Sequence, residues 1–114
     1  MRILIVDDSP VIRRMLRYFL ADIAEQVEEC VDGADALAAY EEHRPDWVLM
    51  DLSMPRLDGL TAMRGLLAAH PEARVAILTQ HDSLALRTAA TQAGAREYLL
   101  KDDLTQLRDL LAGS

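Results

Sequence analysis

Short apolar runs alternate with amphipathic helical patterns five times along the 114-residue chain. The apolar runs are rich in β-branched and other aliphatic residues, which is typical of strands buried on both faces of a parallel sheet. They span residues 3–6, 26–31, 47–50, 75–78 and 97–100, and the second is the weakest. The helical patterns between and after them span residues 10–20, 34–43, 60–67, 83–93 and 104–111. This alternation predicts an α/β fold in which a parallel sheet carries helices on both faces.

The length of the chain predicts a single domain over residues 1–114, because no linker, repeat or low-complexity tract divides it. Its one cysteine, Cys30, cannot form an internal disulfide. The apolar start of the chain stops at Asp7, too early for a signal peptide, and no run approaches the roughly 18 apolar residues of a membrane span. We therefore expect a cytoplasmic protein that does not enter membranes.

The balance of charged residues limits the classes of partner that we expect this segment to bind. Twelve Lys and Arg residues stand against nineteen Asp and Glu residues, for a formal net charge of −7. Attraction between basic side chains and phosphates is the main term in nucleic-acid binding. The composition therefore argues against direct binding of DNA or RNA by this segment, and it is compatible with an acidic site for a metal cation.

Polar side chains follow four of the five predicted strands. Asp7 and Asp8 follow the first, Asp51 the third, Thr79 the fourth and Lys101 the fifth. The carboxyl ends of parallel strands meet at one edge of a sheet, where such folds gather their functional groups. We therefore expect three carboxylates, one hydroxyl and one ammonium group to lie close together.

Such a cluster points to metal-dependent phosphoryl chemistry. Two carboxylates about 4 Å apart repel by roughly 1 kcal/mol in water and about 4 kcal/mol at an effective dielectric near 20. Mg²⁺ removes that conflict, because it takes one or two carboxylates, keeps several waters and accepts phosphate oxygens. A carboxylate can act as the nucleophile, and a metal with a lysine can neutralise the phosphoryl oxygens.

The segments 5–9, 49–55 with Asp58-Gly59, 77–79 and 93–101 resemble the receiver domains of two-component response regulators. The resemblance covers essentially the whole chain, and the Lys101-Asp102 pair is similar to receivers of the NarL/LuxR type. It implies a flavodoxin-like (CheY-like) fold: a doubly wound (βα)5 domain whose five strands lie in the order 2-1-3-4-5.

The resemblance also implies a role for each site residue. Asp51 would be the phosphoacceptor that becomes an aspartyl phosphate. Asp8, Asp51 and the main-chain carbonyl of Ser53 would bind Mg²⁺ (or Mn²⁺), and Asp7 would act through a bound water. Lys101 would pair with the phosphoryl group.

Two further residues would transmit the phosphorylation of Asp51 to the surface of the domain. On phosphorylation Thr79 would move toward the phosphoryl group, and Tyr98 would turn inward behind it. The surface made by the fourth helix, fifth strand and fifth helix would then change.

The chain departs from the family pattern at two positions. Asp102 stands where many receivers have a proline after a cis peptide bond, and a cis bond before another residue costs about 2.5–4 kcal/mol. This leaves the geometry of the bond from Lys101 open. Gln80 is longer than the small residue usual after the switch threonine, so we expect it to narrow access to the site. Ser53 and His81 occupy positions that tune the lifetime of the phosphoryl group in the family.

The partners implied are a sensor histidine kinase or histidine phosphotransfer protein, and a downstream protein or output domain. No output domain is expected within residues 1–114, so the chain is either an excised receiver or a natural single-domain protein. Dimerisation through the face of the fourth helix, fifth strand and fifth helix is a further expectation from the family. Arg13, Arg14 and Arg17 are interpreted as a solvated helix face, with kinase docking as the second interpretation.

Three functions stay open at this stage. The first is an active phospho-receiver, which catalyses only its own phosphorylation and dephosphorylation. The second is a pseudo-receiver that binds proteins without using phosphate, against which stands the complete set of site residues. The third is an aspartate-nucleophile phosphatase, which usually carries an acid/base aspartate where this chain has Ser53 and also a cap domain.

Overall fold

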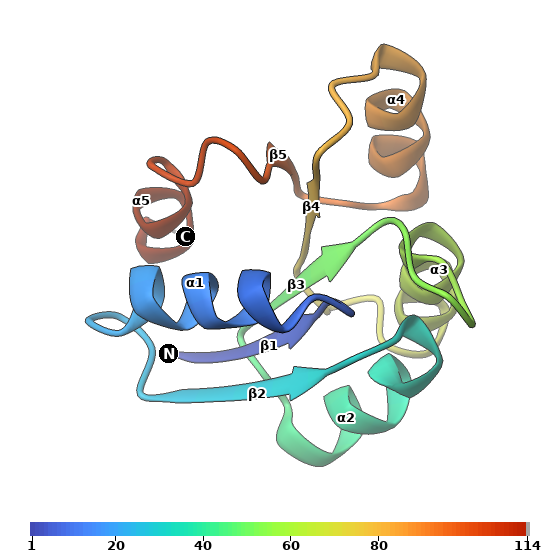
Figure 1. The fold of residues 1–114 in the computed structure, drawn as a ribbon. Coiled ribbons are helices and arrows are strands. Elements are labelled where there is room, and N and C mark those ends of the chain that lie inside the picture. Colours follow the sequence, from blue (N-terminus) through green and yellow to red (C-terminus); the bar gives the residue numbers. More distant parts are fainter. Residues whose placement is uncertain (114) are drawn as a thin grey trace.

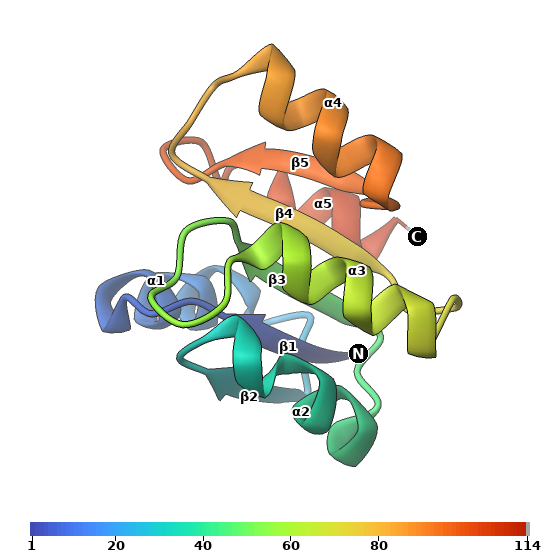
Figure 2. The ribbon, with the colours of Figure 1, turned by 90° about the vertical axis from the view of Figure 1, so that its right-hand side faces the viewer.

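Five parallel strands form one sheet in the order β2-β1-β3-β4-β5 in the computed structural model, which describes residues 1–113. The predicted strand order is confirmed, and Figure 2 shows it from β2 to β5 across the sheet. The strands are β1 (Arg2–Val6), β2 (Gln26–Cys30), β3 (Trp47–Asp51), β4 (Val75–Thr79) and β5 (Glu97–Leu100). Asp51 and Thr79 are the last residues of their strands, as predicted.

One α-helix follows each strand along the chain. The helices are α1 (Pro10–Leu20), α2 (Ala36–His43), α3 (Gly59–Ala69), α4 (Leu84–Ala93) and α5 (Leu107–Ala112), with a 3₁₀ turn η1 (Gly33–Asp35) before α2. Within residues 1–113, no helix has the length and apolar character needed to cross a bilayer.

Two predicted helices begin too early. The second begins as α-helix only at Ala36, because the Asp32 side chain accepts a hydrogen bond from the Ala34 N–H and holds a tight 3₁₀ turn there. The fifth begins at Leu107, because the Asp103 carboxylate accepts from the Thr105 hydroxyl at 2.6 Å and forms a separate turn. Side-chain bonds of this kind compete with the helix for the backbone.

The sheet separates two apolar layers, because successive strand side chains point to opposite faces. Leu4, Val48 and Ile77 belong to the core shared with α2, α3 and α4. Ile5 and Leu49 belong to the core shared with α1 and α5. Figures 1 and 2 show this division, with α2, α3 and α4 on one face and α1 and α5 on the other.

Three helices begin at the carboxyl edge of the sheet with a side-chain cap. Ser9 accepts from the Ile12 N–H at 3.3 Å, Asp58 from the Thr61 N–H at 2.9 Å and Ser83 from the Leu86 N–H at 3.2 Å. Caps of this kind satisfy N–H groups that the helix leaves unpaired. They fix the three loops that follow β1, β3 and β4, and these loops surround the site.

The solvated arginine face predicted for the first helix is confirmed for Arg14 and Arg17, which are exposed, but not for Arg13, which is half-buried. Arg14 is exposed, but Arg13 Nε lies 2.7 Å from Glu29 Oε1, and Arg17 forms an ion pair with the same carboxylate. Arg17 also donates to the Val27 carbonyl oxygen at 3.0 Å. Two of the three arginines therefore tie α1 to β2, because their long side chains reach back across the sheet edge.

Candidate functional site

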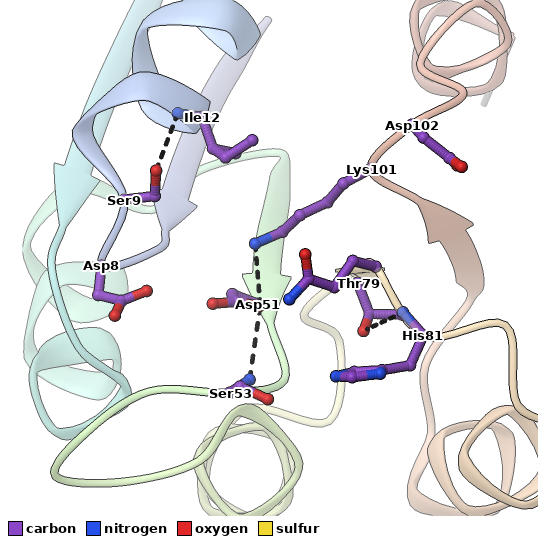
Figure 3. A pocket seen from close by; sticks show the side chains of 10 residues that line it. Asp8, Ser9, Ile12, Asp51, Ser53, Thr79, His81, Lys101 and Asp102 are labelled. Atoms are coloured by element: carbon purple, nitrogen blue, oxygen red, sulfur yellow. Dashed lines mark hydrogen bonds and ion pairs between the residues drawn. The ribbon is translucent and has the colours of Figure 1, made fainter.

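The carboxyl edge of the sheet holds a cavity of about 480 Å³. Figure 3 shows side chains from the ends of β1, β3, β4 and β5 converging on it. The residues that line it are Asp8, Ser9, Ile12, Asp51, Ser53, Thr79, Gln80, His81, Lys101 and Asp102. The sequence prediction that these strand ends meet at one site is therefore confirmed as geometry.

Three carboxylates gather in this site. Asp7, Asp8 and Asp51 each offer an oxygen atom, and these atoms lie within 4.8 Å of one another. Asp7 and Asp51 are buried, with 2% and 6% of their surface exposed, whereas Asp8 is exposed to the cavity. Two like charges held out of water at this spacing are unfavourable without a cation.

The main chain of Asp7 is held on two sides. Its N–H donates to the Cys30 carbonyl oxygen at 3.1 Å, and its own carbonyl oxygen accepts from the Arg13 guanidinium at 2.7 Å. The Asp7 Oδ1 accepts from the Ser9 N–H at 2.9 Å. These contacts fix the main chain and the carboxylate of Asp7 at the end of β1. Arg13 was not among the predicted site residues, and nothing in the local sequence distinguishes it from its neighbour Arg14.

Lys101 supplies the cation that faces this cluster. Its Nζ lies 2.8 Å from Asp7 Oδ2 and 3.1 Å from Asp51 Oδ1, and Figure 3 shows its side chain reaching across the cavity mouth toward Asp51. The Lys101 N–H donates to the Thr79 carbonyl oxygen at 2.8 Å, which fixes the start of the side chain. No peptide bond among residues 1–113 is cis, so the bond to Asp102 is trans.

The positive charge near Asp51 does not fully offset its burial and the nearby charge of Asp7. Burial and the nearby charge of Asp7 raise the pKa of Asp51, and Lys101 offsets only part of that rise. Burial lowers the pKa of Lys101, but the carboxylates of Asp7 and Asp51 outweigh it and hold that pKa above its ordinary value. The lysine is therefore charged, and a single ammonium group faces three carboxylates.

The same atoms fit a divalent cation. Asp7 Oδ2 is buried, and its one contact among the described residues is the ion pair with Lys101 Nζ at 2.8 Å. Carboxylate oxygens are the ligands that Mg²⁺ prefers, and Asp8 and Asp51 open onto a cavity with room for waters and phosphate oxygens.

The loop after β3 returns tightly to the site. Ser53 lines the cavity, and its N–H points to Asp51 Oδ1 at 3.4 Å. The Gly59 N–H donates to the Leu52 carbonyl oxygen at 2.9 Å. A Cβ atom at Gly59 would lie 1.8 Å from the Asp51 carbonyl oxygen, so only glycine lets the loop close this tightly.

Thr79 and Tyr98 both form hydrogen bonds with the main chain of His81. Thr79 is buried, and its Oγ1 accepts from the His81 N–H at 3.1 Å. The Tyr98 hydroxyl donates to the His81 carbonyl oxygen at 2.7 Å, with its ring buried under the Arg87 guanidinium at 4.6 Å. The loop after β4 thus links the hydroxyl at the site to the aromatic ring of β5.

The residues expected to tune access are at the cavity wall. Gln80, His81 and Asp102 are all exposed and all line it. Two predicted site residues, Asp7 and Tyr98, do not line the cavity. Asp7 lies behind it in contact with Lys101, and Tyr98 is linked to the site through His81. The chemical roles of these residues stay predictions.

One buried carboxylate near the site has no counterpart among the predicted site residues. Asp32 has only 2% of its surface exposed and accepts hydrogen bonds from the loop after β3. In the sequence, the Asp32-Gly33 pair suggests only the end of a strand. The sequence carries no signal that this side chain crosses to a loop more than twenty residues away.

Comparisons with known proteins agree with this geometry. The family model described as the response regulator receiver domain matches residues 3–112. An uncharacterized transcriptional regulatory protein of Bacillus subtilis, YhcZ, is 43% identical over 104 residues, which are 90% of this chain and 49% of that protein. The response regulator MprA of Mycobacterium sp. (strain KMS) is 40% identical over 115 residues, covering 96% of this chain and 50% of that protein.

A solved structure shows the same likeness. The crystal structure of a LuxR-family two-component response regulator from Aurantimonas sp. SI85-9A1 superposes with a TM-score of 0.85 and 33% sequence identity, covering 98% of this chain and 85% of that one. The chain spans about half the length of the curated relatives it matches. From the match of the family model and the identity to these relatives, the chain belongs to the response regulator receiver domain family, a family of phosphorelay signalling modules and not a classical enzyme family.

Proposed function

We propose that residues 1–114 act as one phospho-receiver domain in which Asp51 accepts a phosphoryl group in a Mg²⁺-dependent reaction. The observation that carries this proposal is a buried Asp51 whose Oδ1 lies 3.1 Å from Lys101 Nζ, beside two further carboxylates and a cavity of about 480 Å³. A binding module with no phosphate chemistry has no need of three carboxylates arranged against their own repulsion.

In the proposed reaction, an Asp51 oxygen attacks the phosphorus atom of the donor. A new O–P bond forms, and the bond from phosphorus to the donor's leaving group breaks, with the electron pair going to the leaving group. For a phosphohistidine donor the leaving group is the imidazole nitrogen. Asp8, Asp51 and the Ser53 carbonyl would hold Mg²⁺, with Asp7 acting through a water, and the bound ion would supply positive charge for the phosphoryl oxygens. Mn²⁺ has ligand preferences that suit the same site.

The other cation comes from the chain. Lys101 now pairs with Asp7 and Asp51, and in the proposed reaction its ammonium group moves its contact from Asp51 to a phosphoryl oxygen. Thr79 donates its hydroxyl to another phosphoryl oxygen. Because the His81 N–H is hydrogen-bonded to Thr79 and the His81 carbonyl to Tyr98, a shift of Thr79 is passed to the ring of Tyr98 and to α4 and β5.

The proposal includes the partners implied by the family. A sensor histidine kinase or histidine phosphotransfer protein is the phosphoryl donor, and α1 is its docking face. A downstream protein or an output domain responds to the α4–β5–α5 face, through which the receiver can also dimerise. A cytoplasmic location follows, since phosphoryl groups derived from ATP are supplied there. The segment itself does not bind nucleic acid in this proposal, because its net charge is −7.

Gln80 is proposed to limit the rate at which donors reach Asp51. It is exposed and lines the cavity next to Thr79. We expect Gln80→Ala to accept phosphoryl groups from acetyl phosphate a few times faster than the unchanged protein, measured by intact-protein mass spectrometry against time. Equal rates would contradict this role, and Gln92→Ala on the exposed side of α4 is the matched control.

The experiment that tests the whole proposal is phosphorylation of the purified protein with acetyl phosphate, with and without Mg²⁺. We expect one phosphoryl adduct per chain that requires the metal and is lost in Asp51→Asn. Asp58→Asn is the control, because Asp58 is an exposed cap of α3 that the substitution keeps able to cap. Release of many equivalents of phosphate would favour the phosphatase alternative, and absence of any adduct would favour the pseudo-receiver.

A further inference from the structure

Asp32 follows β2, the one strand whose end contributes none of the predicted site residues. Its Oδ1 accepts from the Ala34 N–H at 3.0 Å, which is a local cap of the η1 turn. The same oxygen accepts from the Leu57 N–H at 3.0 Å, and Oδ2 accepts from the Arg56 N–H at 2.9 Å. Two of its three hydrogen bonds therefore go to the backbone of the loop that follows β3, 24 and 25 residues along the chain.

These hydrogen bonds involve a charged acceptor. Hydrogen bonds from the backbone N–H groups of Ala34, Arg56 and Leu57 hold the pKa of Asp32 below its ordinary value, and the Arg56 guanidinium adds to the effect. The carboxylate is ionised at neutral pH, and hydrogen bonds to an ionised acceptor are shorter and stronger than those between neutral groups.

The adjacent glycine brings the two loops into contact. A Cβ atom at Gly33 would lie 2.6 Å from the Leu57 carbonyl oxygen and 2.9 Å from the Ala62 Cβ. The loop after β3 therefore has two fixed points. One is its base, where the Gly59 N–H donates to the Leu52 carbonyl oxygen, and the other is the pair of N–H groups held by Asp32.

Ser53 lies between these fixed points, at the start of the loop and on the cavity wall. We propose that Asp32 is a positioning residue for the metal site: by holding the main chain of Arg56 and Leu57, it sets the place of the Ser53 carbonyl that would bind the metal. This inference rests on the proposed function, in which Ser53 is a ligand. All five strand ends then serve one site, four by contact and the fifth through the loop.

The test is titration of the metal-free protein with Mg²⁺ alone in a calorimeter, comparing three variants. Asp32→Ser keeps a side chain that can cap Ala34 but is too short to reach the loop. Asp32→Asn keeps one oxygen acceptor and places an amide N–H group against a backbone donor. Asp35→Asn is the matched control, because Asp35 lies in the same turn, carries the same charge and contacts the loop only through the Arg56 side chain, at 2.7 Å.

We expect Asp32→Ser to raise the Mg²⁺ dissociation constant roughly tenfold or more, as loss of partners that orient metal ligands does elsewhere. Asp32→Asn should fall between Asp32→Ser and the unchanged protein, and Asp35→Asn should change the constant less than twofold. Amide hydrogen exchange at Arg56 and Leu57 should quicken in Asp32→Ser, with protection of the sheet unchanged. Saturating Mg²⁺ should restore the rate of phosphorylation from acetyl phosphate, because affinity and not chemistry is lost.

An unchanged dissociation constant in Asp32→Ser together with faster exchange at Arg56 and Leu57 would overturn the positioning role, because the loop would be free without effect on the metal. An equal loss in Asp35→Asn would also overturn it in favour of a simple charge effect. If Asp32→Ser loses protection throughout the sheet, Asp32→Asn decides between the same outcomes. Failure of the unchanged protein to bind Mg²⁺ would overturn this inference and the proposed function together, whereas metal binding that ignores Asp32 would overturn this inference alone.

Discussion

The two edges of the sheet both gather charged groups, but they arrange them in opposite ways. At the carboxyl edge Asp7, Asp8 and Asp51 share the single ammonium group of Lys101. At the amino edge, where α2 and α3 end, acidic side chains are paired with basic ones. His70 lies 2.9 Å from Glu41 and 3.5 Å from Glu72, and Arg44 reaches both His70 and Glu72.

Burial separates the two edges further. Asp51 is 6% exposed, whereas the side chains of Glu41 and Glu72 are 51% and 63% exposed. Solvent screens exposed ion pairs, which contribute little to folding, whereas a buried charge without enough partners costs much. The charges at the amino edge are therefore paired and screened by solvent. At the carboxyl edge, buried carboxylates lie close together although they repel one another. That is the physical mark of a site adapted for a ligand.

The largest expected effect is at Lys101. In Lys101→Met, the carboxylates of Asp7 and Asp51 stay buried without their cation, so we expect a loss of about 3 kcal/mol in the free energy of unfolding. Urea unfolding in the presence of a chelator measures it, and Mg²⁺ should restore part of the loss. Arg44→Met at the amino edge is the control, with a change below about 1 kcal/mol. Equal losses in the two variants would contradict the inferred difference between the two edges of the sheet.

Removal of a carboxylate from the same edge should have the opposite sign. Burial and the charge of Asp7 raise the pKa of Asp51, which means that folding disfavours its ionised form. We expect Asp51→Asn to stabilise the metal-free protein by about 1 kcal/mol at neutral pH. Thermal unfolding should also show that Mg²⁺ stabilises the unchanged protein more than this variant. A lower midpoint for Asp51→Asn would contradict the repulsion inferred here.

Glu29 sharpens the comparison, because it is partly buried but well paired. Burial raises its pKa, but hydrogen bonds from Arg17 and Arg13 outweigh this, so the pKa is lowered overall. A carboxylate with a lowered pKa stabilises the fold above its ordinary value of 4.5 and loses that effect as the pH falls through the folded-state pKa. We expect Glu29→Gln to cost about 0.5 kcal/mol at pH 7, and the difference from the unchanged protein to vanish on acidification below 4.5. A difference independent of pH would indicate lost packing instead.

The smallest effect is expected at the amino edge. Glu41→Gln removes from His70 a carboxylate whose side chain is 51% exposed, and pairs screened by solvent contribute about 0.2–1 kcal/mol. The change in unfolding free energy should shrink further at 1 M salt, where the screening length is about 3 Å. A large loss of unfolding free energy that does not depend on salt would show that the charges at the amino edge are as poorly screened as those of the site.

The third, fourth and fifth strands are close to their predicted bounds, because in each an apolar run stops abruptly at a polar residue. Errors arise where side chains bond locally or across the fold. Asp32 and Asp103 delay the starts of α2 and α5, and Arg13 and Arg17 form hydrogen bonds with residues of β2. Periodicity carries no record of such bonds, because it reports only which positions are apolar.

The alternation of apolar runs with helical patterns was enough to predict the α/β fold. The polar residues after those runs then predicted the convergence of Asp7, Asp8, Asp51, Thr79 and Lys101, since parallel strands place their carboxyl ends at one edge. Only the tertiary structure showed that Lys101 contacts Asp7 as well as Asp51, that Tyr98 reaches the site through His81, and that Asp32 holds the loop after β3. These contacts join residues far apart in the sequence. Their formation depends on side-chain length and on loop paths that packing of the whole domain decides.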